Sequence, residues 1–207
     1  MAIRAVLTGD IVNSTRIGKA NERKLLKNLQ QVLAAHLFEF YRGDSLQVFI
    51  KDPTQALQMA LLCRTAGMSI TQNEIVTSSD VRVSIGIGQV HTSVKSLGSA
   101  KGEAFVLSGR AFDDKLHTDT GLVISTPNPL ANAGLQVIAD YMNAIFKVMT
   151  SKQAVVIFEL LKGETQQQVA AKMKKSKSTI NQRVKAGRWP EIEKLLKQYE
   201  NIINQLT

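Results

Sequence analysis

The 207-residue chain has one cysteine, few aromatic residues and no long hydrophobic run. Cys63 cannot form an internal disulfide, and a lone cysteine in an apolar helical stretch usually packs as a small hydrophobic residue. No apolar segment approaches the length that a membrane-spanning helix needs. The chain starts with an apolar strand pattern rather than with a charged region and a hydrophobic leader. We therefore expect a cytoplasmic protein without disulfides and without a membrane partner.

Acidic residues are scarce near the C-terminus, with none between Glu164 and Glu191. The formal net charge is +9, and from Ser151 onward eleven Lys and Arg residues face only five Asp and Glu residues. Most of the excess positive charge therefore lies in roughly the last quarter of the chain. Such a concentration is typical of a surface that binds nucleic acid. A solvated basic helix face would show the same charge and is the alternative.

Apolar residues recur at helical spacing on both sides of a short turn, at residues 169–173 and 180–184. The turn covers residues 174–176, and the hydroxyl of Ser176 or Ser178 would cap the second helix. This spacing predicts a helix-turn-helix whose second helix enters the major groove of double-stranded DNA. The segment resembles the helix-turn-helix of response-regulator and sigma-factor-like DNA-binding domains.

The outward positions of this segment carry basic, amide and hydroxyl side chains. Asn, Gln and Arg can form paired hydrogen bonds with base edges, while Lys neutralises phosphates. The predicted DNA-binding residues are Lys174, Lys175, Lys177, Ser178, Thr179, Asn181, Gln182, Arg183, Lys185 and Arg188.

Strand and helix patterns alternate in the first part of the chain. Strands are predicted at residues 3–8, in two parts of 37–50, and at 81–90 and 121–125; helices are predicted at 21–37, from Pro53, and at 102–117. The order β-α-β-β-α-β with additions predicts an α+β, ferredoxin-like domain over residues 1–126. A connecting helix follows within 127–150. Residues 151–207 are predicted to form a small all-α helix-turn-helix domain, with Ser151 capping its first helix.

Two aspartates of the predicted sheet could reach one point. Asp10 follows the first strand, and Asp44 lies in the turn between the two strands that should pair beside it. Two carboxylates and a backbone carbonyl, such as that of Ile11, are suitable ligands for Mg²⁺ or Mn²⁺. The alternative is that Gly-Asp is an ordinary turn dipeptide at both positions.

Four segments carry a resemblance to a known family, and they span residues 3–125. They are residues 8–14 (TGDIVNS), 43–47 (GDSLQ), 81–88 (VRVSIGIG) and 102–110 (GEAFVLSGR). Together they resemble the SatD family, whose sheet domain is similar to the class III nucleotidyl cyclase catalytic domain. The resemblance implies that Asp10 and Asp44 hold the metal. It also implies that Arg110, with Ser14 nearby, binds the phosphates of a nucleotide ligand.

Three positions depart from the cyclase pattern implied by this resemblance. The ribose-orienting asparagine is replaced by Val106, and the two base-reading positions fall on Phe38 and near Ser99. A site without these groups has little to orient the reacting atoms. We therefore expect a homodimeric DNA-binding transcriptional regulator whose cyclase-like domain senses a ligand and dimerises. The alternatives are a nucleotidyl cyclase-type enzyme that uses a nucleoside triphosphate with a divalent metal, and an assembly protein with a scaffold domain.

Overall fold

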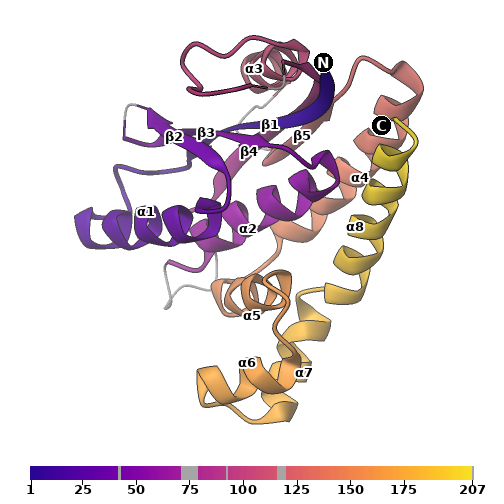
Figure 1. Cartoon of the computed structure of the whole chain (residues 1–207). Coiled ribbons are helices and arrows are strands. Elements are labelled where there is room, and N and C mark those ends of the chain that lie inside the picture. Colours follow the sequence, from indigo (N-terminus) through magenta and orange to yellow (C-terminus); the bar gives the residue numbers. More distant parts are fainter. Residues whose placement is uncertain (42, 71–78, 92, 116–119, 207) are drawn as a thin grey trace.

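The computed structural model describes residues 1–41, 43–70, 79–91, 93–115 and 120–206, and it places a mixed sheet above a group of helices (Figure 1). The sheet strands are β1 (Ala2–Ile11), β2 (Leu37–Tyr41), β3 (Ser45–Ile50), β4 (Val81–Val90) and β5 (Leu122–Ser125). The helices are α1 (Lys19–Leu33), the short 3-10 helix η1 (Pro53–Gln55), α2 (Ala56–Met68), α3 (Glu103–Lys115), α4 (Pro129–Lys147), α5 (Ser151–Leu161), α6 (Gln166–Met173), α7 (Lys177–Ala186) and α8 (Trp189–Asn204).

The sheet has the order β2-β3-β1-β4-β5. The pairs β2–β3, β3–β1 and β1–β4 are antiparallel, whereas β5 runs parallel to β4. The first four strands with α1 and α2 therefore follow the predicted β-α-β-β-α-β order, and α3 and β5 are the additions. This confirms the predicted α+β class, and the observed order of these elements agrees with the predicted one.

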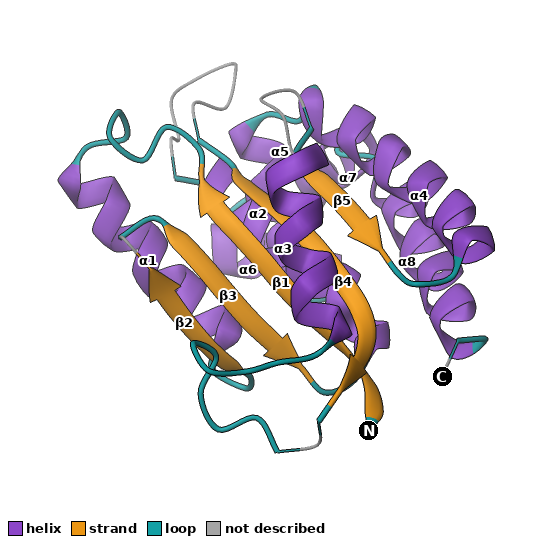
Figure 2. Ribbon diagram, turned by 90° about the horizontal axis from the view of Figure 1, so that it is seen from above, coloured by secondary structure: helices purple, strands orange, loops and turns teal. Residues whose placement is uncertain are grey.

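Helices cover both faces of the sheet (Figures 1 and 2). On one face, α1 buries Leu25, Leu29 and Leu33, which recur every four residues and form one side of the helix. On the other face, α3 packs against β1 and β4, and the Ser108 hydroxyl donates to Thr8 Oγ1 at 2.6 Å. The alternation of side chains along β1 places Thr8 and Asp10 on this second face.

The C-terminal helices share the hydrophobic core of the sheet. Helix α5 packs against α2, and α8 packs against α4 and η1. The buried Tyr199 hydroxyl of α8 donates to the carbonyl of Pro53 at 2.8 Å. Buried residues from β1 to α8 form one continuous hydrophobic cluster. That residues 151–207 form a separate domain accordingly stays a prediction. Helix α4 connects this part to the sheet and also covers β5.

The start of α5 differs from the prediction by one residue. Thr150 is the N-cap: its hydroxyl accepts from the amide of Gln153 at 3.3 Å, and Gln153 Oε1 accepts from the amide of Thr150 at 2.8 Å. Ser151 is instead buried within the first turn. The reason is that a capping box needs Glu or Gln three residues after the cap, and Gln153 meets this spacing only for Thr150.

The length and hydropathy of the helices can be compared with those of a membrane-spanning helix. Within the described ranges, none is both long and apolar enough to cross a bilayer.

Candidate functional site

Helices α6 and α7 are joined by three residues, 174–176, as the sequence predicts. Lys174 ends α6 in the left-handed conformation (φ 52°), which turns the chain sharply. Ser176 rather than Ser178 is the cap of α7, because its hydroxyl accepts from the amide of Thr179 at 3.1 Å. The hydroxyl of Ser178 lies 2.9 Å from that of Ser176. The hydroxyls of Ser176 and Ser178 therefore lie side by side at the N-terminal end of α7.

The inner face of the two helices is small and fully buried. Val169 and Ala170 of α6 and Ile180 and Val184 of α7 belong to the main hydrophobic core. Both helices contact α5, and the three helices form the lower lobe in Figure 1. Burying Ile180 and Val184 fixes which side of α7 faces solvent.

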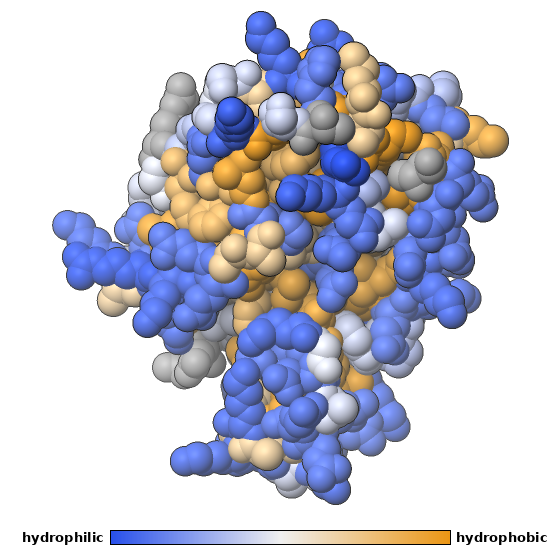
Figure 3. Space-filling model, viewed as in Figure 1, coloured by the Kyte–Doolittle hydropathy of each residue, from blue (hydrophilic) through white to orange (hydrophobic). Residues whose placement is uncertain are grey.

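Most of the predicted DNA-binding residues lie on the solvent side of this lobe. Thr179 and Arg183 are half-buried at its edge. The exposed residues are Lys174, Lys175, Lys177, Ser178, Asn181, Gln182 and Lys185. The space-filling view shows a largely hydrophilic surface over this lobe (Figure 3). The exposed residues of α7 therefore share one side of this helix, next to the exposed lysines of the 174–176 turn.

Arg188 has a different environment from the other predicted contacts. Its guanidinium forms an ion pair with Glu191 at 3.1 Å and donates to the Tyr141 hydroxyl at 2.8 Å. It also lies over the Tyr141 ring, 5.4 Å from the ring centre. These contacts tie the end of α7 to α4, and they leave Arg188 less free to reach a phosphate. Sequence reasoning could not find them because Tyr141 lies 47 residues away.

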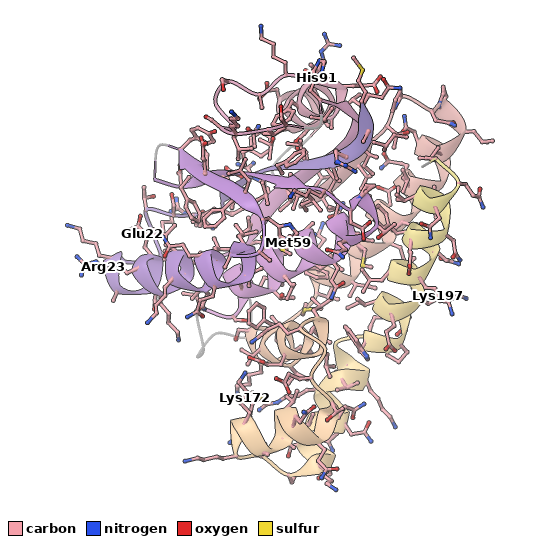
Figure 4. The ribbon with its side chains drawn as sticks, in the orientation of Figure 1. Glu22, Arg23, Met59, His91, Lys172 and Lys197 are labelled. Atoms are coloured by element: carbon pink, nitrogen blue, oxygen red, sulfur yellow. The ribbon has the colours of Figure 1, made fainter. Side chains whose placement is uncertain are left out.

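An ion-pair cluster braces α6 against α5. The carboxylate of Glu159, which is 11% exposed, accepts from Lys172 at 2.6 Å and from Lys162 at 3.3 Å. Lys172 reaches from α6 toward α5 (Figure 4). The hydrogen bond with Glu159 raises the pKa of Lys172 above its usual value. The cluster holds α6 in place and turns the charge of Lys172 away from the surface formed by α7.

The acidic pair lies at one end of β1 and β3. Asp10 stands opposite Ser45 in the strand register, and the amide of Ile11 donates to the carbonyl of Asp44 at 2.9 Å. Ser14 donates its hydroxyl to Asp44 Oδ2 at 3.1 Å. Asp10, Ile11, Ser14 and Asp44 are therefore neighbours, as the predicted pairing of β1 with the hairpin requires.

Arg82 is the residue at this site that the sequence analysis did not identify. Its guanidinium binds both oxygens of the Asp10 carboxylate, at 3.0 and 2.6 Å. The same hydrogen bonds raise the pKa of Arg82 above its usual value. The register that pairs Asp10 with Arg82 on β4 could have suggested the contact, because both side chains face the same side of the sheet.

The arrangement around Asp10 does not fit a bound divalent cation. Both of its oxygens face a guanidinium instead of an open space, and a cation would have to displace Arg82. Across the described part of the chain, no group of three or more His, Cys, Asp or Glu side chains is suited to hold a metal ion. The Mg²⁺ or Mn²⁺ site therefore stays a prediction without geometric support.

The other residues of the expected nucleotide site are scattered. Arg110 is exposed on α3, on the same side of the sheet as Asp10, and within the described chain no hydrogen bond or ion pair holds its guanidinium. Phe38 packs against the hydrophobic core and contacts Phe40 edge to face. Val106 is 48% exposed on α3. These apolar groups offer no polar contact to a ribose or a base.

A metal test follows from the pairing of Asp10. Replacing Arg82 with alanine is expected to make the melting temperature rise with added Mn²⁺, because the Asp10 carboxylate then lacks its guanidinium counter-charge and lies near Asp44 without one. The parent protein should show a much smaller rise. Thermal unfolding with and without Mn²⁺ measures both, and Arg82→Ala combined with Asp10→Asn and Asp44→Asn is the control that should lose the response. An equal response in that control would show that the carboxylates bind no metal.

Comparison with known proteins gives matches only among solved structures. No family model and no curated protein sequence matches the chain. The guanylyl cyclase Cya2 is 14% identical, with a TM-score of 0.37, over 60% of this chain and 75% of that chain. Two structures of a bacterial light-regulated adenylyl cyclase are 14% and 13% identical, with TM-scores of 0.41 and 0.40, over 66% of this chain.

The chain spans 44% of the length of each adenylyl cyclase structure. At these TM-scores the likeness is partial. The description of the fold therefore rests on the strand order and connections given above.

Proposed function

We propose that the chain is a DNA-binding transcriptional regulator that contacts the major groove of duplex DNA through α7. The main support is the two-sided character of this helix. Ile180 and Val184 anchor it in the core, while exposed lysine, amide and hydroxyl groups cover its outer side. Amide side chains such as Asn181 and Gln182 can pair with base edges, and lysines can neutralise phosphates.

Two further features favour this role. The stretch between Glu164 and Glu191 has no carboxylate, so no acidic side chain of this stretch repels a phosphate backbone. The hydroxyls of Ser176 and Ser178 are exposed at the N-terminal end of α7, and helix N-termini are frequent phosphate contacts in DNA complexes. The sheet domain would then regulate or assemble the DNA-binding part.

The alternative is an enzyme that acts on a nucleoside triphosphate through the sheet domain. The position of Asp10 and Arg110 on one side of the sheet favours it. The pairing of Asp10 with Arg82 and the apolar, half-buried side chain of Phe38 count against it. Cyclic product from ATP or GTP with Mn²⁺, lost in Asp44→Asn, would favour the enzyme over the regulator.

DNA binding can be tested by removing charge from the connection between α6 and α7. Replacing Lys174, Lys175 and Lys177 together by alanine is expected to weaken binding to all duplexes. The slope of log affinity against log salt should become less steep by about 3, because about one phosphate contact is lost per lysine. Fluorescence anisotropy at several salt concentrations measures both effects. Binding as tight as that of the parent at every salt concentration would refute the proposal.

The matched control removes the same charge elsewhere. Lys19, Lys24 and Lys27 are exposed on α1, so their replacement by alanine changes the net charge equally. This control should keep most of the affinity and the salt slope. Within α7, Asn181→Ala or Gln182→Ala should chiefly reduce discrimination between sequences, by about 1–3 kcal/mol for a lost bidentate contact. A preferred sequence for this measurement comes from selection on random duplexes.

A further inference from the structure

Helix α4 carries an unusual concentration of exposed hydrophobic side chains. Within the described ranges, six large hydrophobic residues are exposed, and four of these belong to α4 or directly follow it. They are Leu130 (84% exposed), Val137 (67%), Tyr141 (37%) and Val148 (73%). Contiguous exposed apolar surface of this kind is typical of an interaction site.

These four residues lie on one line along the helix. Their separations are seven, four and seven residues, which keep them on one side of a helix with 3.6 residues per turn. The exposed Ala133 and Ala144 lie between them on the same line. We call this set of six residues the α4 stripe. The opposite side of α4 is buried against β5 and α8, and α4 forms one edge of the molecule in Figure 2.

We propose that a second copy of this chain covers the α4 stripe, with the two α4 helices antiparallel about a two-fold axis. The separations read the same from both ends of the stripe, and the axis would cross the stripe midway between Val137 and Tyr141. Leu130 then faces Val148 of the other copy, and Val137 faces its Tyr141. A two-fold contact requires such self-complementarity, whereas a different partner would not.

The two alanines of the α4 stripe, Ala133 and Ala144, are also compatible with antiparallel pairing of two α4 helices. Ala133 of one copy lies close to Ala144 of the other, so small side chains meet between the outer Leu130–Val148 contacts and the central Val137–Tyr141 contacts, and the helices can approach closely. Asp140 and Lys147 are the charged residues of α4, and both are exposed beside the stripe. The pairing therefore leaves the charged residues of α4 itself at the edge of the contact.

The size of the stripe sets the strength of the expected dimer. From Leu130 to Val148 the helix rises about 27 Å at about 1.5 Å per residue. A contact one helix wide and of this length is smaller than the roughly 800 Å² per partner of a standard interface. We expect a dimer that dissociates in the micromolar range. Its formation does not depend on DNA and can be measured without it.

The contact also lies close to α7. Tyr141, near the middle of the stripe, contacts the guanidinium of Arg188, which lies between α7 and α8. Pairing through α4 would fix Tyr141 and so the end of α7. This differs from the dimer expected from the sequence, which uses the sheet domain of residues 1–126.

The first experiment places a charge at the centre of the stripe. Val137→Glu should weaken the dimer at least tenfold in sedimentation equilibrium across the micromolar range, because it buries an unpaired carboxylate. Its melting temperature should stay near that of the parent monomer, since Val137 is exposed. The matched control is Val106→Glu, the same change at an exposed valine of α3, and it should leave the dimer intact.

Two results of this experiment would overturn the proposal. One is a parent protein that stays monomeric throughout the concentration range. The other is a dimer that survives Val137→Glu, whether or not Val106→Glu disrupts it. Disruption by Val106→Glu alone would assign the contact to the sheet domain instead.

A second experiment tests the antiparallel arrangement. A mixture of Leu130→Cys and Val148→Cys proteins should form a disulfide-linked dimer under mild oxidation, whereas either variant alone should not. The native Cys63 does not interfere, because it is fully buried and burial raises the pKa of its thiol to about 12. Cross-linking of either variant with itself would indicate parallel helices and would contradict the proposed axis.

Discussion

Arg64→Ala is expected to lower the free energy of unfolding by about 3–5 kcal/mol, the usual cost of removing one partner of a buried ion pair. Arg64 is 3% exposed, and its guanidinium lies 2.6 Å from Asp80 Oδ2. It also donates to Asn143 Oδ1 at 3.0 Å and lies over the ring of Phe146. The substitution leaves the Asp80 carboxylate without its counter-charge and opens a cavity between α2 and α4.

Another arginine–aspartate pair provides a matched control. Arg82 and Asp10 have the same closest distance, 2.6 Å, but their side chains are 26% and 20% exposed, against 4% and 22% for Arg64 and Asp80. Arg82→Ala should therefore cost only about 1 kcal/mol or less, because water screens the pair and solvates what remains.

Urea unfolding followed by circular dichroism measures both variants. Adding Asp80→Asn to Arg64→Ala should recover part of the loss, since it removes the uncompensated charge. Equal losses for Arg64→Ala and Arg82→Ala would show that burial does not set the contribution of these pairs.

The role of Arg64 also shows what the sequence could not predict. The apolar run of α2 predicts a buried helix, and every residue of α2 except Gln58 is buried. The run does not predict that a charged residue within it is buried too. That depends on Asp80 and Asn143, which lie 16 and 79 residues further along the chain.

The candidate sites also differ in how much of each one the sequence predicts. The α6–α7 pair follows from local apolar spacing and from a cap next to the helix it serves, so the sequence predicts it closely. The neighbourhood of Asp10 and Asp44 follows from the expected pairing of β1 with the hairpin. The guanidinium that neutralises Asp10 comes from β4, 72 residues away, and only the strand register reveals it.

The sequence predicts the helix that carries the α4 stripe but not the exposure of the stripe. The sequence predicts a connecting helix here, because the apolar spacing resembles that of any buried helix. Periodicity shows that residues share one side of a helix, but it does not show whether the chain itself covers that side. The positions of β5 and α8 decide this, and they cover the other side of α4.

The last prediction concerns the contact between α3 and the sheet. A Cβ atom added at Gly86 of β4 would lie 2.2 Å from the carbonyl oxygen of Ala104 and 2.3 Å from the amide nitrogen of Ser108. Both are backbone atoms of α3 and cannot rotate away, so the whole helix would have to move. Gly86→Ala is therefore expected to lower the free energy of unfolding by about 3 kcal/mol, at the upper end of overpacking effects.

Gly109→Ala is the matched control for Gly86→Ala because it lies on α3 itself and a Cβ there would meet nothing within 4 Å. It should stabilise the protein by about 0.5–1 kcal/mol, since alanine loses less conformational freedom than glycine in a helix. The displaced helix in Gly86→Ala should also lose the hydrogen bonds from Ser84 to Ser108 and from Ser108 to Thr8. Urea unfolding measures the two stabilities, and amide hydrogen exchange measures the local opening of α3. If Gly86→Ala unfolds at the same urea concentration as the parent, α3 does not pack on β4 as closely as described, and Arg110 need not lie on the same side of the sheet as Asp10.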